Sequence, residues 1–124
     1  MGKFLVKTTP TGVKFDLLTA EGNVIASSEV YKTEASCMGG VKSVMNNAPR
    51  ANVEDQTVEG YETVKHPKFE LYNDKKGDFR YRLKATNGEI IATGSSYPDK
   101  QAALDAIECV KKSSDGAQIV KGEE

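Results

Sequence analysis

The chain has 124 residues, enough for one ordinary domain, and its 38% hydrophobic and 28% charged residues are typical of a globular protein rather than a disordered one. Seventeen Lys and Arg residues balance eighteen Asp and Glu residues, so the overall charge does not favour nucleic acid or an anionic membrane as a partner. No apolar run is long enough to span a membrane, and we expect a cytoplasmic protein without a membrane partner.

The chain is predicted to begin with three short strands. Residues 4–8 form the first, and a turn containing Pro10 and Gly12 follows it. Residues 13–17 alternate apolar and polar side chains with period two, which indicates a strand with one buried face. A tight turn then leads into a third strand over residues 24–28. Three strands joined by short turns predict an antiparallel meander.

A helix is predicted over about residues 33–47. Thr33 is a good N-cap residue, and the apolar residues that follow it recur at helical spacing. The members of this apolar stripe are Cys37, Val41, Val44 and Ala48. Pro49 ends the helix, and residues 51–58 are predicted to form a fourth short strand.

The same order of elements is predicted for the second half of the chain. Residues 79–85 show the clearest apolar and polar alternation, and Asn87-Gly88 is a strong hairpin signal. Asp99 is predicted to cap a helix over about residues 99–113, and residues 117–121 form the last strand.

A sequence pattern that runs from a turn glycine to a tyrosine occurs twice, and it shows that the chain is an internal duplication. The matching pairs are Gly22/Gly88, Ile25/Ile91, Ala26/Ala92 and Tyr31/Tyr97. We therefore predict that residues 1–124 are a single domain made of two repeats, at about 3–54 and 68–121. A connection at about 55–67 joins them.

The two repeats are predicted to share one sheet. One unit alone has about 50 residues and is marginal for independent stability. It would also leave an unpaired sheet edge, which natural proteins avoid. We therefore expect an α+β fold of two tandem β-β-β-α-β repeats that share one antiparallel sheet, with both helices on one face and exchanged C-terminal strands. In this arrangement residues 117–121 pair with the first repeat and 51–58 with the second. Since one chain supplies both units, we expect a monomer.

The chain resembles the YegP-like family of small, uncharacterised bacterial and archaeal proteins. The resemblance lies in the strand-turn-strand pattern, the Gly-x-x-Ile-Ala-x-x-x-x-Tyr run and the end of the first helix at residues 41–49, and it covers about residues 3–54 and 68–121. It implies one continuous sheet built from two β3-α-β motifs with exchanged C-terminal strands. The resemblance provides no catalytic residues that could be assigned to this chain.

No constellation of residues typical of an enzyme, a cofactor or a metal site is present in the sequence. His66 is the single histidine, and it has no Cys or Asp at ligand spacing, so we expect it to be solvated. Cys37 and Cys109 occupy different positions in the two repeats, which favours two buried thiols over a disulfide. We predict a protein that is not an enzyme and that has no catalytic residues, cofactor or metal.

One row of residues suggests a binding face. Period-two alternation places Arg80, Arg82 and Lys84 on the outer face of a strand, and Tyr72 and Glu70 share this face from the neighbouring strand. A basic row with an aromatic residue can hold single-stranded nucleic acid by phosphate contacts and stacking. Alternatively, this is a solvated face on which Glu70 pairs with an arginine. The first repeat carries Lys14, Asp16 and Leu18 at the corresponding positions, which disfavours nucleic acid. We therefore predict a structural or protein-interaction module with an unknown protein partner, and single-stranded nucleic-acid binding is the alternative.

Overall fold

The structure, a computed structural model, describes residues 2–122 and contains eight strands, two α-helices and one short 3₁₀ helix. The elements, in chain order, are β1 (Lys3–Thr9), β2 (Gly12–Leu18), β3 (Val24–Ser27), α1 (Glu34–Asn47), η1 (Ala48–Arg50), β4 (Asn52–Asp55), β5 (Lys68–Asn73), β6 (Phe79–Lys84), β7 (Ile90–Thr93), α2 (Lys100–Ser114) and β8 (Gln118–Gly122). Both predicted helices are confirmed, and each begins one residue later than expected.

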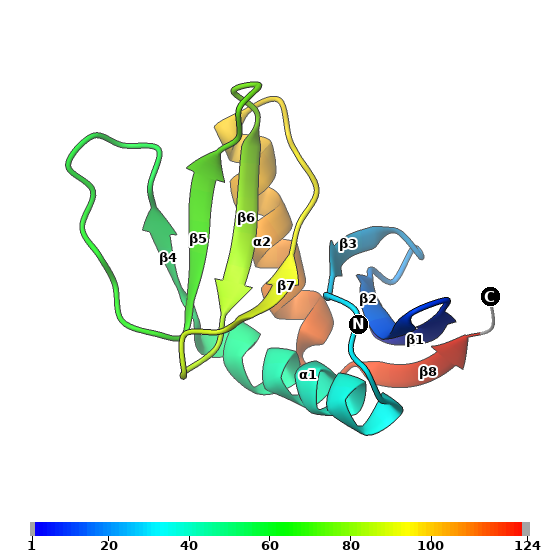
Figure 1. The fold of residues 1–124 in the computed structure, drawn as a ribbon. Helices are drawn as coiled ribbons and strands as arrows, with labels where there is room; N and C mark the ends of the chain where they lie inside the picture. Colours follow the sequence, from blue (N-terminus) through cyan, green and yellow to red (C-terminus); the bar gives the residue numbers. More distant parts are fainter. Residues whose placement is uncertain (1, 123–124) are drawn as a thin grey trace.

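All eight strands form one sheet, in the order β4-β5-β6-β7-β3-β2-β1-β8 (Figure 1). The two repeats meet at its centre, where Ser27 of β3 lies opposite Thr93 of β7. The predicted exchange of strands is confirmed, since β4 of the first repeat pairs with β5 of the second and β8 of the second pairs with β1 of the first. Each outer edge of the sheet is therefore built by the other repeat.

The prediction of a purely antiparallel sheet is wrong, because both exchanged strands pair in parallel with their neighbours. A hairpin turn forces its two strands to be antiparallel, whereas a strand that follows a helix is free to run in either direction. The predicted strand at 51–58 is also too long, since β4 ends at Asp55. The Asp55 carboxylate accepts hydrogen bonds from the backbone N–H and the hydroxyl of Thr57, and this local turn ends the strand.

Both helices cover the same face of the sheet, and each contacts strands of both repeats. Helix α1 packs on β1 and β2 and also on β7, whereas α2 packs on β6 and also on β1, β2 and β3. Thr33 and Asp99 cap the helices by accepting hydrogen bonds from the Ser36 and Ala102 N–H groups, at 3.1 and 2.8 Å. The layer between helices and sheet is the hydrophobic core, and its largest fully buried side chains are Tyr81, Phe4, Phe15, Phe69, Leu17, Leu71, Leu83 and Ile107.

Tyr81 ties the two repeats together inside this core. Its ring is 1% exposed and stacks on Tyr97, and its hydroxyl donates a hydrogen bond to the Ile25 carbonyl oxygen of the first repeat. Burial raises the pKa of Tyr81, so the phenol stays protonated and remains a donor. Gly94 leaves the room that this ring needs, since a Cβ atom there would lie 2.2 Å from the Tyr81 ring. The core is thus continuous across the repeats.

Candidate binding face of the sheet

The face of the sheet opposite the helices, here called the outer face, is the candidate functional surface. Strand pairing aligns one row of its side chains through all eight strands. In spatial order the row is Glu54, Glu70, Arg82, Thr93, Ser27, Asp16, Leu5 and Val120. The second repeat's half of this face is charged, whereas the first repeat's half becomes apolar toward β8. The two repeats therefore share the same fold, but the side chains on their halves of the outer face differ in charge and polarity.

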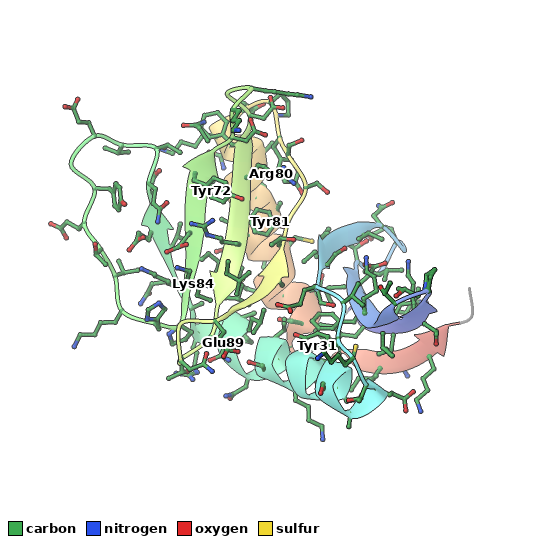
Figure 2. The ribbon with its side chains drawn as sticks, in the orientation of Figure 1. Tyr31, Tyr72, Arg80, Tyr81, Lys84 and Glu89 are labelled. Atoms are coloured by element: carbon green, nitrogen blue, oxygen red, sulfur yellow. The ribbon has the colours of Figure 1, made fainter. Side chains whose placement is uncertain are left out.

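The predicted basic row lies on the second repeat's half, along β5 and β6 (Figure 2). Glu70, which is 3% exposed, neutralises most of it. Its carboxylate is 2.5 Å from Arg82 Nε and 3.2 Å from Lys84 Nζ. The guanidinium carbon of Arg82 also lies 4.6 Å from the centre of the Tyr72 ring, which is a cation–π contact. Two of the three cations and the aromatic ring are thus engaged with each other or with Glu70.

Arg80 is the exception in this row. Among residues 2–122, no carboxylate oxygen lies within 4.0 Å of its guanidinium group. Arg80 is half-buried and lines a pocket beside the turn between β5 and β6. Arg80, Arg82, Lys84 and Tyr72 thus lie along the same two strands, but Arg80 stands apart from the ion pairs that occupy Arg82 and Lys84.

A buried ion cluster, formed by Glu54, Lys68 and Glu70, lies beside this row. Lys68 is 5% exposed, and its Nζ is 2.8 Å from Glu54 Oε1 and 3.5 Å from Glu70 Oε2. The connection between the repeats lies against this cluster, because the Val64 N–H donates a hydrogen bond to Glu54 Oε1. Sequence reasoning missed the cluster, since the register between β4 and β5, which come from different repeats, brings Glu54 and Lys68 together.

The surroundings of Glu54 determine its ionisation. Burial alone would raise its pKa, but hydrogen bonds from Lys68, Gln56 and the Val64 N–H outweigh that effect and lower the pKa from 4.5 to about 2. Burial likewise opposes the charged form of Lys68, yet the hydrogen bond to Glu54 and the charges of Glu54 and Glu70 raise the Lys68 pKa. Burial also opposes the charge of Glu70, but Arg82 and Lys84 lower the Glu70 pKa, so all three groups are charged at neutral pH.

These shifts predict how stability depends on pH. The folded-state pKa of Glu54 lies below its ordinary value, so its contribution is complete above about pH 4.5 and is lost as the pH falls toward about 2. We expect the free energy of unfolding, measured by urea titration at pH 2, 3, 4.5 and 7, to decrease over this window. The Glu54→Gln variant should show a shallower decrease. An equal acid dependence in both proteins would contradict this assignment.

The first repeat's half of the outer face carries an apolar patch, defined here as Leu5, Leu18, Val24 and Val120. Leu5 lies opposite Val120, Leu18 lies opposite Val24, and Leu5 and Leu18 are diagonal neighbours. Val24 is 49% exposed and Val120 is 38% exposed, whereas the two leucines are half-buried. The four side chains thus form a continuous diagonal that ends on β8.

Strand β8 gives this half of the face an open edge, because among the strands that the structure describes β8 has a neighbour on one side only. All residues from Gln118 to Lys121 are exposed. The opposite edge strand, β4, differs, since the connection that follows it lies against its Glu54 side chain. An edge strand with unpaired backbone groups is a template for an additional strand.

The possible metal ligands, the two cysteines and the histidine add no second candidate site among residues 2–122. Among residues 2–122, no group of three or more His, Cys, Asp and Glu side chains is placed to hold a metal ion. Cys37 is buried, Cys109 is only partly buried, and both are free thiols. His66 is exposed, in agreement with its prediction. No helix within the described part of the chain has the length and apolar character needed to cross a bilayer.

Comparison with known proteins points to one family. The family described as "Domain of unknown function (DUF1508)" matches residues 12–55 and 74–120, which lie in the two repeats. The UPF0339 protein PA0329 of Pseudomonas aeruginosa is 30% identical over 118 residues, which cover 94% of each chain. The UPF0339 protein of Treponema denticola is 50% identical over 54 residues, 44% of this chain but 93% of the relative, so that protein has the length of one repeat.

Solved structures give the same result for the fold. The solution NMR structure of yegP from E. coli, described as a protein of unknown function, superposes with a TM-score of 0.80 at 24% identity. The alignment covers 98% of this chain and 93% of that one. The UPF0339 protein SO3888 of Shewanella oneidensis gives the same TM-score and identity. The expected resemblance is confirmed: the chain belongs to the YegP-like family, described as DUF1508 or UPF0339, whose function is unknown.

Proposed function

We propose that the protein is a non-catalytic protein-interaction module that binds an extended, apolar segment of a partner protein at the apolar patch and the free edge of β8. The observation that carries this proposal is the exposure of Val24 and Val120 on a sheet face without a helix over it. Contiguous exposed apolar side chains next to charged ones are typical of protein-binding surfaces. An extended segment pairing with β8 would also satisfy the backbone groups of that edge.

The charges around the patch support a protein partner over nucleic acid. Asp16 accepts a hydrogen bond from the Ser27 hydroxyl and is 2.7 Å from Lys7 Nζ and 3.2 Å from Lys14 Nζ. Burial would raise the pKa of Asp16, but its partners, Lys7 first, lower it, so these lysines face a carboxylate. Glu70 plays the same part for Arg82 and Lys84. Single-stranded nucleic acid needs a groove of cations free to contact phosphates.

A binding role without catalysis is favoured by the chemistry of the face. The carboxylates of Asp16, Glu54 and Glu70 lie in ion pairs that lower their pKa values, whereas a general acid near neutral pH needs a raised pKa. The free thiols do not lie on it, since Cys37 is a core residue of α1 and Cys109 is on α2. In this proposal the protein is cytoplasmic. It acts as a monomer, because one chain supplies both repeats.

The two repeats provide a matched pair of variants that tests the proposal. Val24 and Ile90 occupy equivalent positions and are 49% and 41% exposed, but only Val24 belongs to the apolar patch. Immobilised Val24→Glu protein should lose its partner in a pull-down from a lysate of the cells that produce the protein, because the carboxylate would have to be buried at the interface. Immobilised Ile90→Glu protein should retain the partner.

The same pull-down separates the alternative functions. Capture that persists at high salt and after nuclease treatment supports a direct protein partner, whereas capture lost on nuclease treatment supports nucleic acid. Retention of the same partners by the wild-type protein, Val24→Glu and Ile90→Glu would overturn the assignment to the apolar patch. Melting temperatures of both variants close to that of the wild type exclude misfolding as the cause of lost binding.

A further inference from the structure

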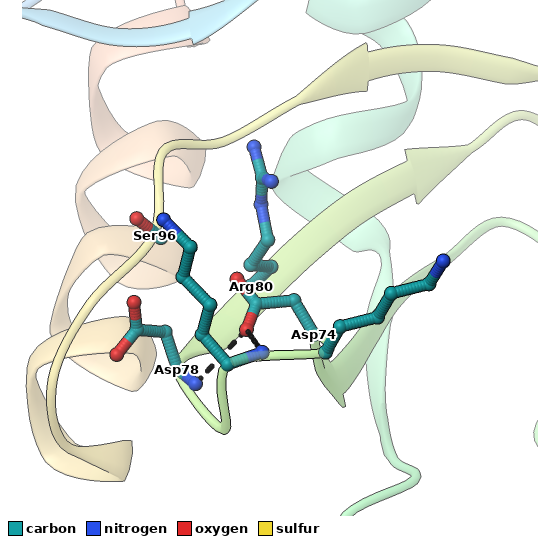
Figure 3. Close-up of a pocket in the computed structure, with 6 residues that line it drawn as sticks. Asp74, Asp78, Arg80 and Ser96 are labelled. Carbon is teal, nitrogen blue, oxygen red and sulfur yellow. Dashed lines mark hydrogen bonds between the residues drawn. The ribbon is translucent and has the colours of Figure 1, made fainter.

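The turn between β5 and β6 has a fixed shape that the first repeat lacks. The Asp74 Oδ1 atom accepts hydrogen bonds from the backbone N–H groups of Lys76 and Asp78, at 2.9 and 3.0 Å (Figure 3). The Gly77 N–H donates to the Asp74 carbonyl oxygen, and the φ of +88° at Gly77 is one that glycine adopts readily. Asp74 thus holds the turn together and fixes the backbone at Lys76 and Asp78.

A pocket of about 340 Å³ lies beside this turn. Its lining comes from the turn, from β6 and from the segment before α2, and consists of Asp74, Lys75, Lys76, Asp78, Arg80 and Ser96. Figure 3 shows that Arg80 and Ser96 approach it from two different chain segments. The volume lies at the lower end of the roughly 300–1,000 Å³ of small-molecule sites.

The cations of this pocket are available to a ligand. Within residues 2–122, none of Lys75, Lys76 and Arg80 lies within 4.0 Å of a carboxylate oxygen. They differ in this from Arg82 and Lys84, which Glu70 neutralises. A planar guanidinium group, lysine ammonium groups and a serine hydroxyl are the donors that proteins use to bind phosphate oxygens.

We propose that this pocket binds a phosphate-sized oxyanion, either free or as the phosphate group of a small molecule. Arg80 provides two parallel N–H donors to the anion, Lys75 and Lys76 provide charge, and the Ser96 hydroxyl donates a further hydrogen bond. This site is separate from the apolar patch, which lies on the other repeat. Anion binding at this site therefore does not depend on the proposed protein partner.

The Asp78 carboxylate also lines the pocket and repels a bound anion, so one substitution should weaken anion binding and another should strengthen it. Three cations and two carboxylates line the pocket. The Asp74 carboxylate is engaged by the amides of the turn, whereas the Asp78 side chain makes no hydrogen bond or ion pair to any described residue. The negative charge of Asp78 repels an anion at short range, so removing that charge should strengthen anion binding.

The first repeat lacks the features that form the pocket. Lys14 occupies the position of Arg80, but its Nζ lies 3.2 Å from Asp16. Val30 stands in place of Ser96, and the turn before β2 contains Pro10 and Thr11 instead of the two lysines. A chain with two pseudo-equivalent turns is therefore expected to bind a single anion.

The test is a titration of the ¹⁵N-labelled full chain with inorganic phosphate at constant ionic strength, followed by the backbone amide signals in NMR spectra. Saturable shifts should appear at residues 74–80 and at Ser96. Arg80→Gln should weaken binding about tenfold or more, whereas Asp78→Asn should tighten it several-fold, as expected for one charge at short range. A second titration with glycerol phosphate distinguishes a free anion from a phosphate ester.

Lys42→Gln is the matched control, since Lys42 is an exposed cation on α1 outside the pocket. It should bind phosphate as the wild type does. Shifts that do not saturate, or equal weakening by Arg80→Gln and Lys42→Gln, would overturn the proposal, and so would the absence of tightening by Asp78→Asn. Should Arg80→Gln give a poorly dispersed spectrum, Lys76→Gln and Ser96→Ala replace it, and unchanged binding in both would likewise reject the site.

Discussion

Replacing Lys68 with alanine should destabilise the protein by about 3–5 kcal/mol, the usual effect of removing one partner from a buried ion pair. Lys68 is the cation of the buried ion cluster, and its loss leaves Glu54, which is 2% exposed, without its main counter-charge. Glu70 would keep Arg82 and Lys84. The free energy of unfolding from urea titration at pH 7 measures the effect.

Two further variants separate the loss of charge pairing from general damage. Lys42→Ala removes an exposed lysine and should change stability by less than about 0.5 kcal/mol. The double variant Glu54→Leu with Lys68→Met replaces the whole pair with apolar side chains, and it should recover most of the lost stability. If Lys68→Ala costs no more than Lys42→Ala, or if the double variant is as unstable as Lys68→Ala, the cluster does not stabilise the fold in the way described.

Deleting residues 116–124 should destabilise the first repeat, although these residues belong to the second. The deletion removes β8, whose residues Ile119 and Lys121 lie opposite Phe4 and Val6 of β1. Phe4 and Val6 are 0% and 3% exposed, and full burial of each is worth about 1.5–3 kcal/mol. Partial exposure of both gives an expected loss of about 3 kcal/mol.

Native-state hydrogen exchange on the truncated protein measures this loss strand by strand. Amides of β1 and β2 should exchange about 100-fold faster than in the full chain, which corresponds to about 3 kcal/mol. Truncation after residue 122 is the control, because it keeps all of β8, and it should leave these rates unchanged. Faster exchange in β6 with full protection in β2 would mean that the last strand stabilises its own repeat.

Much of the fold was predictable because its signals are local. The capping residues Thr33 and Asp99 and the apolar stripe of each helix fix the helices within one residue. The turn at Gly88 fixes a hairpin, and its φ is +86°. The exchange of strands was predictable for another reason, since each unit alone leaves an open sheet edge. The direction of the exchanged strands did not follow, because alternation with period two is the same read in either direction.

The candidate surface was predictable only in part, because its chemistry depends on contacts between distant segments. Alternation placed Arg80, Arg82 and Lys84 on one face, but a pairing register decides which of them meets Glu70. The buried ion cluster needs the register between β4 and β5, which no local pattern encodes. The apolar patch likewise needs β8 beside β1, so that Val120 extends the diagonal from Leu5. Periodicity therefore predicts the face of a residue and allowed a Glu70–arginine pair, but the register decides that this arginine is Arg82.

The position of β8 also has a consequence for the order of events during synthesis of the chain. Lys3 pairs with Gln118, so one strand pair joins the two ends of the sequence. The β1 edge of the nascent first repeat stays unpaired until α2 and β8 have been synthesised. Strand β4 likewise has no partner until β5 has been synthesised. Contacts between residues so far apart in sequence form slowly, because a long loop must close before they contribute. We therefore expect the emerging chain to acquire its complete sheet only after its last strand has left the ribosome.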